Sequence, residues 1–361
     1  MWKSSEFTAG EWVEVRSREE ILSTLDGNGQ LDGLPFMPEM LQFCGQRLPV
    51  FRRAHKTCDP PNGLQGRRMA AAVHLDGLRC DGSAHGGCQA GCLMFWKDAW
   101  LKKADAPAAD GQAAAPGAEQ SVPREAGISE AEKTVWAGTR QPDQPADEPR
   151  FVCQSTQIAA ATTPLAWHDV RQYVEDWTSG NVRLSQMFAS AMYSMCEAIA
   201  TAGLGIGSAI RWMYDTVQAS RGATPYPSRT GRVPAGTKTP SAQLGLQVGE
   251  LVKVRPYQEI LETIDQKSHN RGMVWDGEMV PFCGGTYRVL QRVNRIIDEK
   301  TGRMLQMKNE CIQLDGVTCQ ACYAKYRKFC PRSIFPYWRE IWLQRADSYM
   351  PGTARSVSRC D

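Results

Sequence analysis

Ten of the thirteen cysteines fall into two groups of five, one in each half of the chain, and these thiols are the side chains whose spacing could support chemistry. Each group ends in a close cluster: Cys80, Cys88 and Cys92 in the first, and Cys319, Cys322 and Cys330 in the second. A structural zinc ion takes four such ligands, and iron–sulfur clusters are also held by four thiolates. The spacing predicts a thiolate-bound metal in each half, with zinc as the first expectation; an iron–sulfur cluster and buried or redox-active thiols are the alternatives.

The cysteines recur because part of the chain is repeated. Residues 10–80 align with residues 249–319 at a constant offset of 239, and 17 of the 41 positions in 10–50 are identical to their counterparts. A three-residue insertion then changes the offset to 242. Recurrence nominates three ligands per copy; Cys92 or Cys58 completes the first set, and Cys311 or Cys322 the second. The expected ligands are Cys44, Cys80, Cys88 and Cys92, and Cys283, Cys311, Cys319 and Cys330.

The remaining cysteines and one histidine indicate a metal site less clearly than the two groups of five. Cys153, Cys196 and Cys360 have no repeat partner, so we interpret them as structural or exposed thiols. His85 could replace a thiolate, but its glycine-rich flank is more typical of a mobile loop.

A glutamate also recurs, as Glu39 and Glu278, five residues before a candidate cysteine. A carboxylate near a metal can orient a ligand or act as a general base. Pairing with an arginine such as Arg52 or Arg292 is the more common arrangement and is the expectation here. No phosphate-binding loop, nucleophile elbow or HExxH motif is present, so nothing in the sequence indicates an enzyme.

The repeated segments predict strands followed by a short helix. Apolar and polar residues alternate in 10–16 and 249–255, as in a half-buried strand, and 18–26 and 257–265 have the apolar spacing of a helix. Residues 295–307 predict a hairpin that turns at Thr301-Gly302. Each copy closes with two tryptophans four residues apart, which predicts a helical turn packed on the strands.

Composition divides the rest of the chain. Residues 104–149 and 220–243 are rich in Pro, Ala and Gly and predict flexible linkers. The segment between them has helical periodicity, and its part 187–210 is long enough to cross a bilayer but contains Glu197 and mostly small residues, so a spanning helix is not favoured. The expected organisation is 1–103 module 1, 104–149 disordered linker, 150–219 helical segment, 220–243 linker, 244–346 module 2 and 347–361 tail.

The net charge and the N-terminal segment limit the functions and the cellular location that we expect. Charged residues make up 22 % of the 361 residues and the net charge is +3, which lacks the basic excess of a nucleic-acid-binding protein. The N-terminal segment lacks the pattern of a secretion signal, so we expect a cytoplasmic protein, where thiols stay reduced.

Two longer strings, at 295–319 and 329–345, carry a resemblance to a bacterial protein family associated with polysaccharide and natural-product gene clusters. The opening strand, the short helix and the segment around Cys44 resemble small SH3-like barrels of electron-transfer accessory subunits. The resemblance implies an α+β chain with two SH3-like modules and implies no particular activity. We expect a zinc-stabilised tandem-module interaction or accessory protein for a bacterial biosynthetic enzyme, with a protein partner; the alternative is a redox or electron-transfer accessory protein with iron–sulfur clusters or reactive thiols.

Overall fold

The computed structural model describes residues 3–63, 65–106, 129–142, 144–145 and 148–346. The chain divides into two compact units. Unit 1 takes residues from 1–182, 295–306 and 330–332, and unit 2 takes residues from 183–294, 307–329 and 333–361. The predicted tail 347–361 and part of the predicted linker, 107–128, lie outside the described residues.

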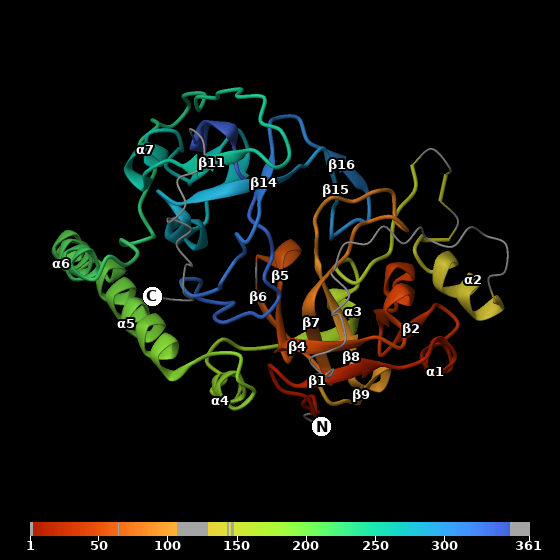
Figure 1. Ribbon diagram of the computed structural model, residues 1–361. Helices are drawn as coiled ribbons and strands as arrows, with labels where there is room; N and C mark the ends of the chain where they lie inside the picture. Colours follow the sequence, from red (N-terminus) through yellow and green to blue (C-terminus); the bar gives the residue numbers. More distant parts are fainter. Residues whose placement is uncertain (1–2, 64, 107–128, 143, 146–147, 347–361) are drawn as a thin grey trace. The chain divides into compact units, whose positions relative to one another are not determined.

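Unit 1 is built on a five-stranded antiparallel sheet with the order β8-β7-β4-β1-β9, which curls into a half barrel (Figure 1). A register shift between Val50 and Arg52 interrupts the pairing of β4 with β7, and such a bulge increases the local twist. The sheet strands are β1 (Trp12–Val15), β4 (Arg47–Arg53), β7 (Ala72–Arg79), β8 (Leu93–Lys97) and β9 (Leu101–Lys103). The other elements are α1 (Arg18–Leu22), β2 (Gln30–Leu31), β3 (Leu34–Pro35), η1 (Pro38–Phe43), β5 (Lys56–Asp59), η2 (Pro60–Asn62), β6 (Gln65–Met69), η3 (Asp98–Trp100), α2 (Glu130–Ala137), α3 (Ile158–Ala161), β10 (Thr162–Pro164) and α4 (Arg171–Thr178).

Unit 2 has a four-stranded sheet with the order β17-β14-β11-β18, which repeats the strands β7-β4-β1-β9 of unit 1. Val252 pairs with Tyr287 where unit 1 pairs Val13 with Leu48, and a register shift recurs after Val289. The duplication is therefore structural, and the predicted α+β class is confirmed. The elements are α5 (Leu184–Thr201), α6 (Gly207–Ser220), β11 (Leu251–Val254), α7 (Tyr257–Leu261), β12 (His269–Asn270), β13 (Met273–Val274), η4 (Gly277–Phe282), β14 (Thr286–Arg292), β17 (Ile312–Leu314), η5 (Glu340–Trp342) and β18 (Leu343–Arg345).

The predicted tryptophan pairs close both cores. Trp96 and Trp100 are fully buried in unit 1, and their counterparts in unit 2 are buried in the same way. The indole of Trp100 donates a hydrogen bond to Thr24 Oγ1 (3.1 Å), and the indole of Trp342 donates to Thr263 Oγ1 (2.8 Å). The short turns η3 and η5 that carry the second tryptophan are 3₁₀ helices.

The predicted hairpin is confirmed as β15 (Arg295–Ile297) and β16 (Met304–Gln306), but it belongs to unit 1 although the repeat assigns it to the second copy. Its turn contains Gly302, whose φ of 72° is in the left-handed region that glycine tolerates. The Gly302 carbonyl accepts the Phe151 amide (2.8 Å), and Ile297 packs with Cys88 and Phe151. Unit 1 is thus completed by a segment more than a hundred residues downstream.

Parts of the two predicted linkers are ordered. Residues 130–137 form α2 inside the segment expected to be disordered, because Ser129 caps the helix and Val135 is buried in the unit 1 core. No helix or strand forms between α6 and β11, as expected, but Tyr226 is fully buried and anchors this stretch in unit 2.

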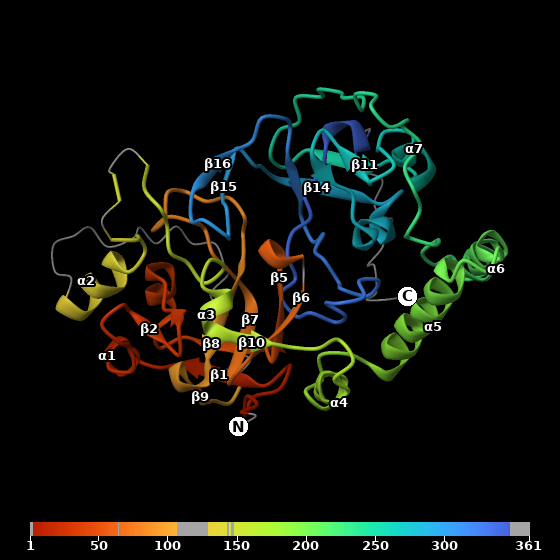
Figure 2. The ribbon, with the colours of Figure 1, turned by 180° about the vertical axis from the view of Figure 1, so that it is seen from behind.

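The predicted middle helices are present as α4, α5 and α6, and the glycines at 203, 205 and 207 separate α5 from α6 (Figures 1 and 2). Among the helices described here, none combines the length and the apolar character needed to cross a membrane.

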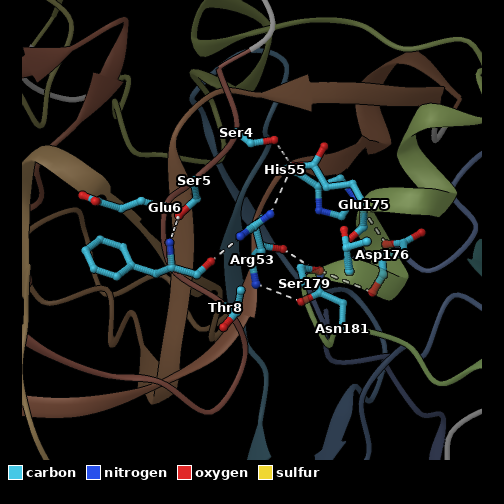
Figure 3. Close-up of polar contacts among 12 residues, drawn as sticks. Ser4, Ser5, Glu6, Thr8, Arg53, His55, Glu175, Asp176, Ser179 and Asn181 are labelled. Atoms are coloured by element: carbon cyan, nitrogen blue, oxygen red, sulfur yellow. Dashed lines mark hydrogen bonds and ion pairs between the residues drawn. The ribbon is translucent and has the colours of Figure 1, made fainter.

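Polar contacts fix α4 and the segment after it to the sheet of unit 1 (Figure 3). Asn181 donates to the Arg53 carbonyl (2.8 Å) and accepts the Arg53 amide (2.9 Å). His55 Nε2 lies 3.3 Å from Asp176 Oδ1, and both side chains are fully buried. Lys56 Nζ lies 2.5 Å from Asp176 Oδ2, so one buried carboxylate on α4 joins two residues at the start of β5.

Candidate metal centre

A cavity in unit 1 is lined by four cysteines. It is partly open to solvent. Cys80 follows β7, Cys88 and Cys92 lie in the loop that leads to β8, and Cys153 comes from the segment before α3. The remaining walls are mostly apolar and include Met37, Met94 and Phe95. None of the four thiols is in a disulfide.

Cys80 is the first member of a chain of three side chains. His85 Nε2 lies within hydrogen-bond distance of Cys80 Sγ (3.4 Å), and His85 Nδ1 lies 3.0 Å from Glu39 Oε1. The latter two atoms are not aligned as a hydrogen bond, and Glu39 Oε2 is buried with no partner among the described residues. Glu39 Oε1 accepts the Ala84 amide (3.0 Å). His85 is only 2 % exposed, so the expected mobile-loop histidine is wrong, and Glu39 contacts this histidine rather than an arginine.

Two other cavity sulfurs receive hydrogen bonds. The Ile297 amide donates to Cys88 Sγ (3.3 Å), and the Ser155 hydroxyl donates to Cys92 Sγ (3.3 Å). The Thr156 and Ser155 amides act on Cys153 in the direction that lowers its pKa. A neutral thiol is a weak acceptor, whereas a thiolate is a strong one, so these donors favour the charged form.

Burial acts in the opposite direction. It raises the pKa of Cys153 to about 12 and also raises the pKa values of Cys80 and Cys88, although the backbone donors offset part of this. Four thiolates in such a site therefore require compensating positive charge, and a coordinated metal supplies it directly. Arg332 does not supply this charge alone: it is 1 % exposed and Nη2 donates to Ser155 Oγ (2.8 Å), but it is also paired with the carboxylate of Glu299 (2.6 Å).

The separation of the sulfurs distinguishes between metals. Tetrahedral zinc with Zn–S bonds of about 2.3 Å places its sulfurs about 3.8 Å apart. Within the part of the chain that the structure describes, the one group of three such ligand atoms that all lie within 4.8 Å of one another is Glu39, Cys80 and His85. No three of the four cavity thiols are this close. Iron–sulfur clusters hold their thiolates farther apart, because irons and sulfides lie between them.

In comparisons with known proteins, no family model, curated protein or solved structure matches this chain. The chemistry of the cavity must be inferred from its own residues.

The expected ligand sets are only partly brought together. Cys80, Cys88 and Cys92 line the cavity, whereas Cys44 packs against the unit 1 core, where burial raises its pKa to about 11. Cys330 and the alternative ligand Cys58 are buried in unit 1 but do not line the cavity.

In the second copy, the ligands expected for one site lie in different surroundings. Cys283 packs against the unit 2 core, and burial raises the pKa of Cys311 to about 12. Cys319 Sγ accepts a hydrogen bond from Arg327 Nη1 (3.4 Å). The described residues of unit 2 contain no group of three ligand atoms within 4.8 Å.

The repeated glutamate has a common structural role. Glu278 accepts the amides of Cys322, Tyr323 and Ala324, and Glu39 accepts the Ala84 amide at the position equivalent to Tyr323. Each carboxylate therefore holds the loop that follows Cys80 or Cys319. Only unit 1 adds a buried histidine to this arrangement.

Sequence reasoning missed Cys153, which we had interpreted as a structural or exposed thiol. It lies 61 residues beyond Cys92 and outside the repeat, so no local spacing or recurrence identifies it. The donors from Ser155 and Ile297 were missed for the same reason, since only the fold brings their segments to the cavity.

Proposed function

We propose that unit 1 binds an iron–sulfur cluster through Cys80, Cys88, Cys92 and Cys153, and that the protein is a redox or electron-transfer accessory protein. The observation that carries the proposal is that four thiols, from the loop at 80–92 and the segment before α3, line one cavity, and that hydrogen-bonding groups lie beside their sulfurs. No three of these sulfurs lie within 4.8 Å of one another, which favours a cluster over a single zinc ion.

The surrounding residues suit this role. A cluster would supply one-electron transfer, and its potential depends on hydrogen bonds to the sulfurs and on solvent access. His85, Ser155 and the Ile297 amide would stabilise added negative charge on the thiolates. The apolar wall formed by Met37, Met94 and Phe95 would limit water.

Structural zinc is the second candidate, and one observation favours it. Glu39, Cys80 and His85 already form a compact group of possible ligand atoms, to which a further thiol could be added. Such a site would stabilise unit 1 as a docking module without redox chemistry.

The proposal also covers the fold type of the two units and the partner of the protein. The two sheets are consistent with SH3-like barrels, of which unit 1 would carry the cluster and unit 2 would contact a partner enzyme in a bacterial biosynthetic pathway in the cytoplasm. Two tethered modules raise the effective concentration of the second contact, which supports a bivalent accessory role.

Anaerobic purification of the full chain tests the assignment. We expect iron and acid-labile sulfide in equal amounts and a visible absorbance that reduction bleaches. Cys153→Ser should lose most of the iron, because one ligand of four is removed, whereas Cys196→Ser, a buried thiol of α5, should keep it. Zinc without sulfide would favour the second candidate, and a metal-free folded protein would exclude both.

The histidine gives a second prediction. His85→Ala should keep the iron but lower the reduction potential, on the order of tens of millivolts, because a hydrogen bond to a thiolate stabilises the reduced cluster. His168→Ala, an exposed histidine before α4, is the matched control. Potentiometric titration measures both variants, and an unchanged potential in His85→Ala would show that the contact with Cys80 does not tune the cluster.

A further inference from the structure

The α-hairpin formed by α5 and α6 turns every charged side chain inward. Between residues 184 and 220, all of which are described, the charged residues are Glu197, Arg211 and Asp215, and none of them is exposed. Glu197 and Asp215 accept hydrogen bonds from the side chain and the amide of Tyr226, and the Arg211 guanidinium lies 5.5 Å from the centre of its ring. These three charged groups therefore lie around Tyr226, on the side that faces the rest of unit 2.

The inner side is also held by tyrosine packing and by a lysine. Tyr193 of α5 packs against the rings of Tyr214, Tyr226 and Tyr323 at 5.0–6.0 Å between centroids. Lys328 Nζ donates to the hydroxyls of Ser190 and Ser194 on α5. The orientation of α5 is therefore fixed, and so is the set of residues that it exposes.

The exposed side of α5 carries a heptad pattern. Its spacing alternates four and three residues, which is the repeat of a helix that packs along another helix. Phe188 is 69 % exposed and Met195 is 50 % exposed. We name this set the α5 seam; its members are Leu184, Phe188, Ala191, Met195, Ala198 and Ala202, all exposed.

Large and small residues of the α5 seam are arranged so that the helix complements itself. If a second α5 lies antiparallel, with the twofold axis level with residue 193, Leu184 lies opposite Ala202, Phe188 opposite Ala198 and Ala191 opposite Met195. Every pair then combines one large and one small side chain, which is how helices interdigitate without voids or overlap. A symmetric dimer interface needs this reciprocity, because each residue i that contacts j requires that j contact i.

We propose that two copies of this chain associate through antiparallel packing of the α5 seam about a twofold axis near residue 193. A second copy of the chain suits this face because the face carries no charged residue, so like charges do not meet across the twofold axis. The centres of protein interfaces are also depleted in charged residues. A membrane surface fits less well, because helices that bind it present lysine and arginine on the polar side, and this hairpin exposes neither between residues 184 and 220. The proposal does not depend on the identity of the metal in unit 1.

A size-exchange experiment tests the proposal on the full chain by sedimentation velocity over a range of concentrations. The wild type should be a dimer. Phe188→Ala should leave a void opposite Ala198, and Ala198→Phe should place two phenylalanines opposite each other, so each single variant should raise the dimer dissociation constant at least about tenfold. The double variant Phe188→Ala/Ala198→Phe restores one large and one small residue per pair and should return the constant to within about threefold of the wild type.

Controls separate the interface from other effects. All these positions are exposed in the single chain, so the circular dichroism and metal content of the variants should match the wild type. Val274→Ala, at an exposed apolar position on β13 of unit 2, should leave the dissociation constant unchanged. A monomeric wild type, a dimer that the single variants do not weaken, or a double variant no stronger than the single variants would each overturn the proposal. Flotation of a monomeric wild type with anionic vesicles would assign the face to a membrane and would overturn it equally.

Discussion

Asp176→Ala is expected to lower the free energy of unfolding by about 3–5 kcal/mol, which would be among the largest effects of any single substitution in unit 1. Lys56 is 4 % exposed at its side chain, and its ammonium lies 2.5 Å from the Asp176 carboxylate. Removal of the carboxylate leaves a buried ammonium without its counter-charge and leaves His55 without the oxygen at 3.3 Å. Urea denaturation measures the change.

Two comparisons make the Asp176 result specific. Asp169→Ala removes an ion pair with Arg171, whose side chain is 69 % exposed, and should cost less than about 1 kcal/mol. The double variant Lys56→Met/Asp176→Leu replaces both charges by apolar groups and should recover most of the loss, because a buried ion pair contributes little beyond its own desolvation. A loss in the double variant as large as in Asp176→Ala would show that shape, rather than the uncompensated charge, is the cause.

Removal of the proposed iron–sulfur cluster is expected to destabilise unit 1 by more than about 5 kcal/mol, which is comparable with the whole stability of a domain. The cavity would then contain four neutral thiols, which are weak acceptors for their donors, and the loop from Cys80 to Cys92 would lose the group that ties it to Cys153. Hydrogen exchange with mass spectrometry should show loss of protection in β7, β8 and the β15–β16 hairpin. Peptides from β11 and β14 of unit 2 serve as the internal control and should be unaffected. Unchanged protection throughout would mean that the cysteines are core residues that need no metal.

Periodicity and recurrence could predict the parts of the fold that depend on local sequence. The strand at 12–15, its counterpart at 251–254, the short helices and the hairpin at 295–306 all have strong local patterns, and all are present. The helix α2 was missed because it is held by tertiary contacts, through buried Val135 and the ion pair of Glu132 with Arg18, within a segment of low apolar content. Composition alone does not reveal such a contact.

The candidate site was predictable in part for a related reason. Cys80, Cys88 and Cys92 are close in sequence, so their spacing indicates a shared site before any fold is known. Cys44 also recurs in the repeat, but it packs against the core, and recurrence cannot distinguish a ligand from a core residue. Cys153 joins the cavity only through tertiary structure, so the decisive fourth thiol was beyond the reach of spacing arguments.

Because the β15–β16 hairpin comes from a later part of the chain than the rest of unit 1, unit 1 can be completed only late in synthesis. On the ribosome, residues 1–182 emerge with all four cavity cysteines present, yet the amide of Ile297 that contacts Cys88 and the guanidinium of Arg332 that contacts Ser155 are still to be synthesised. Because contacts so distant in sequence form slowly, the cavity would stay open on this side while most of unit 2 is made. A metal group to be inserted would have that interval to enter the cavity. The β15–β16 hairpin would then cover the open side of the cavity.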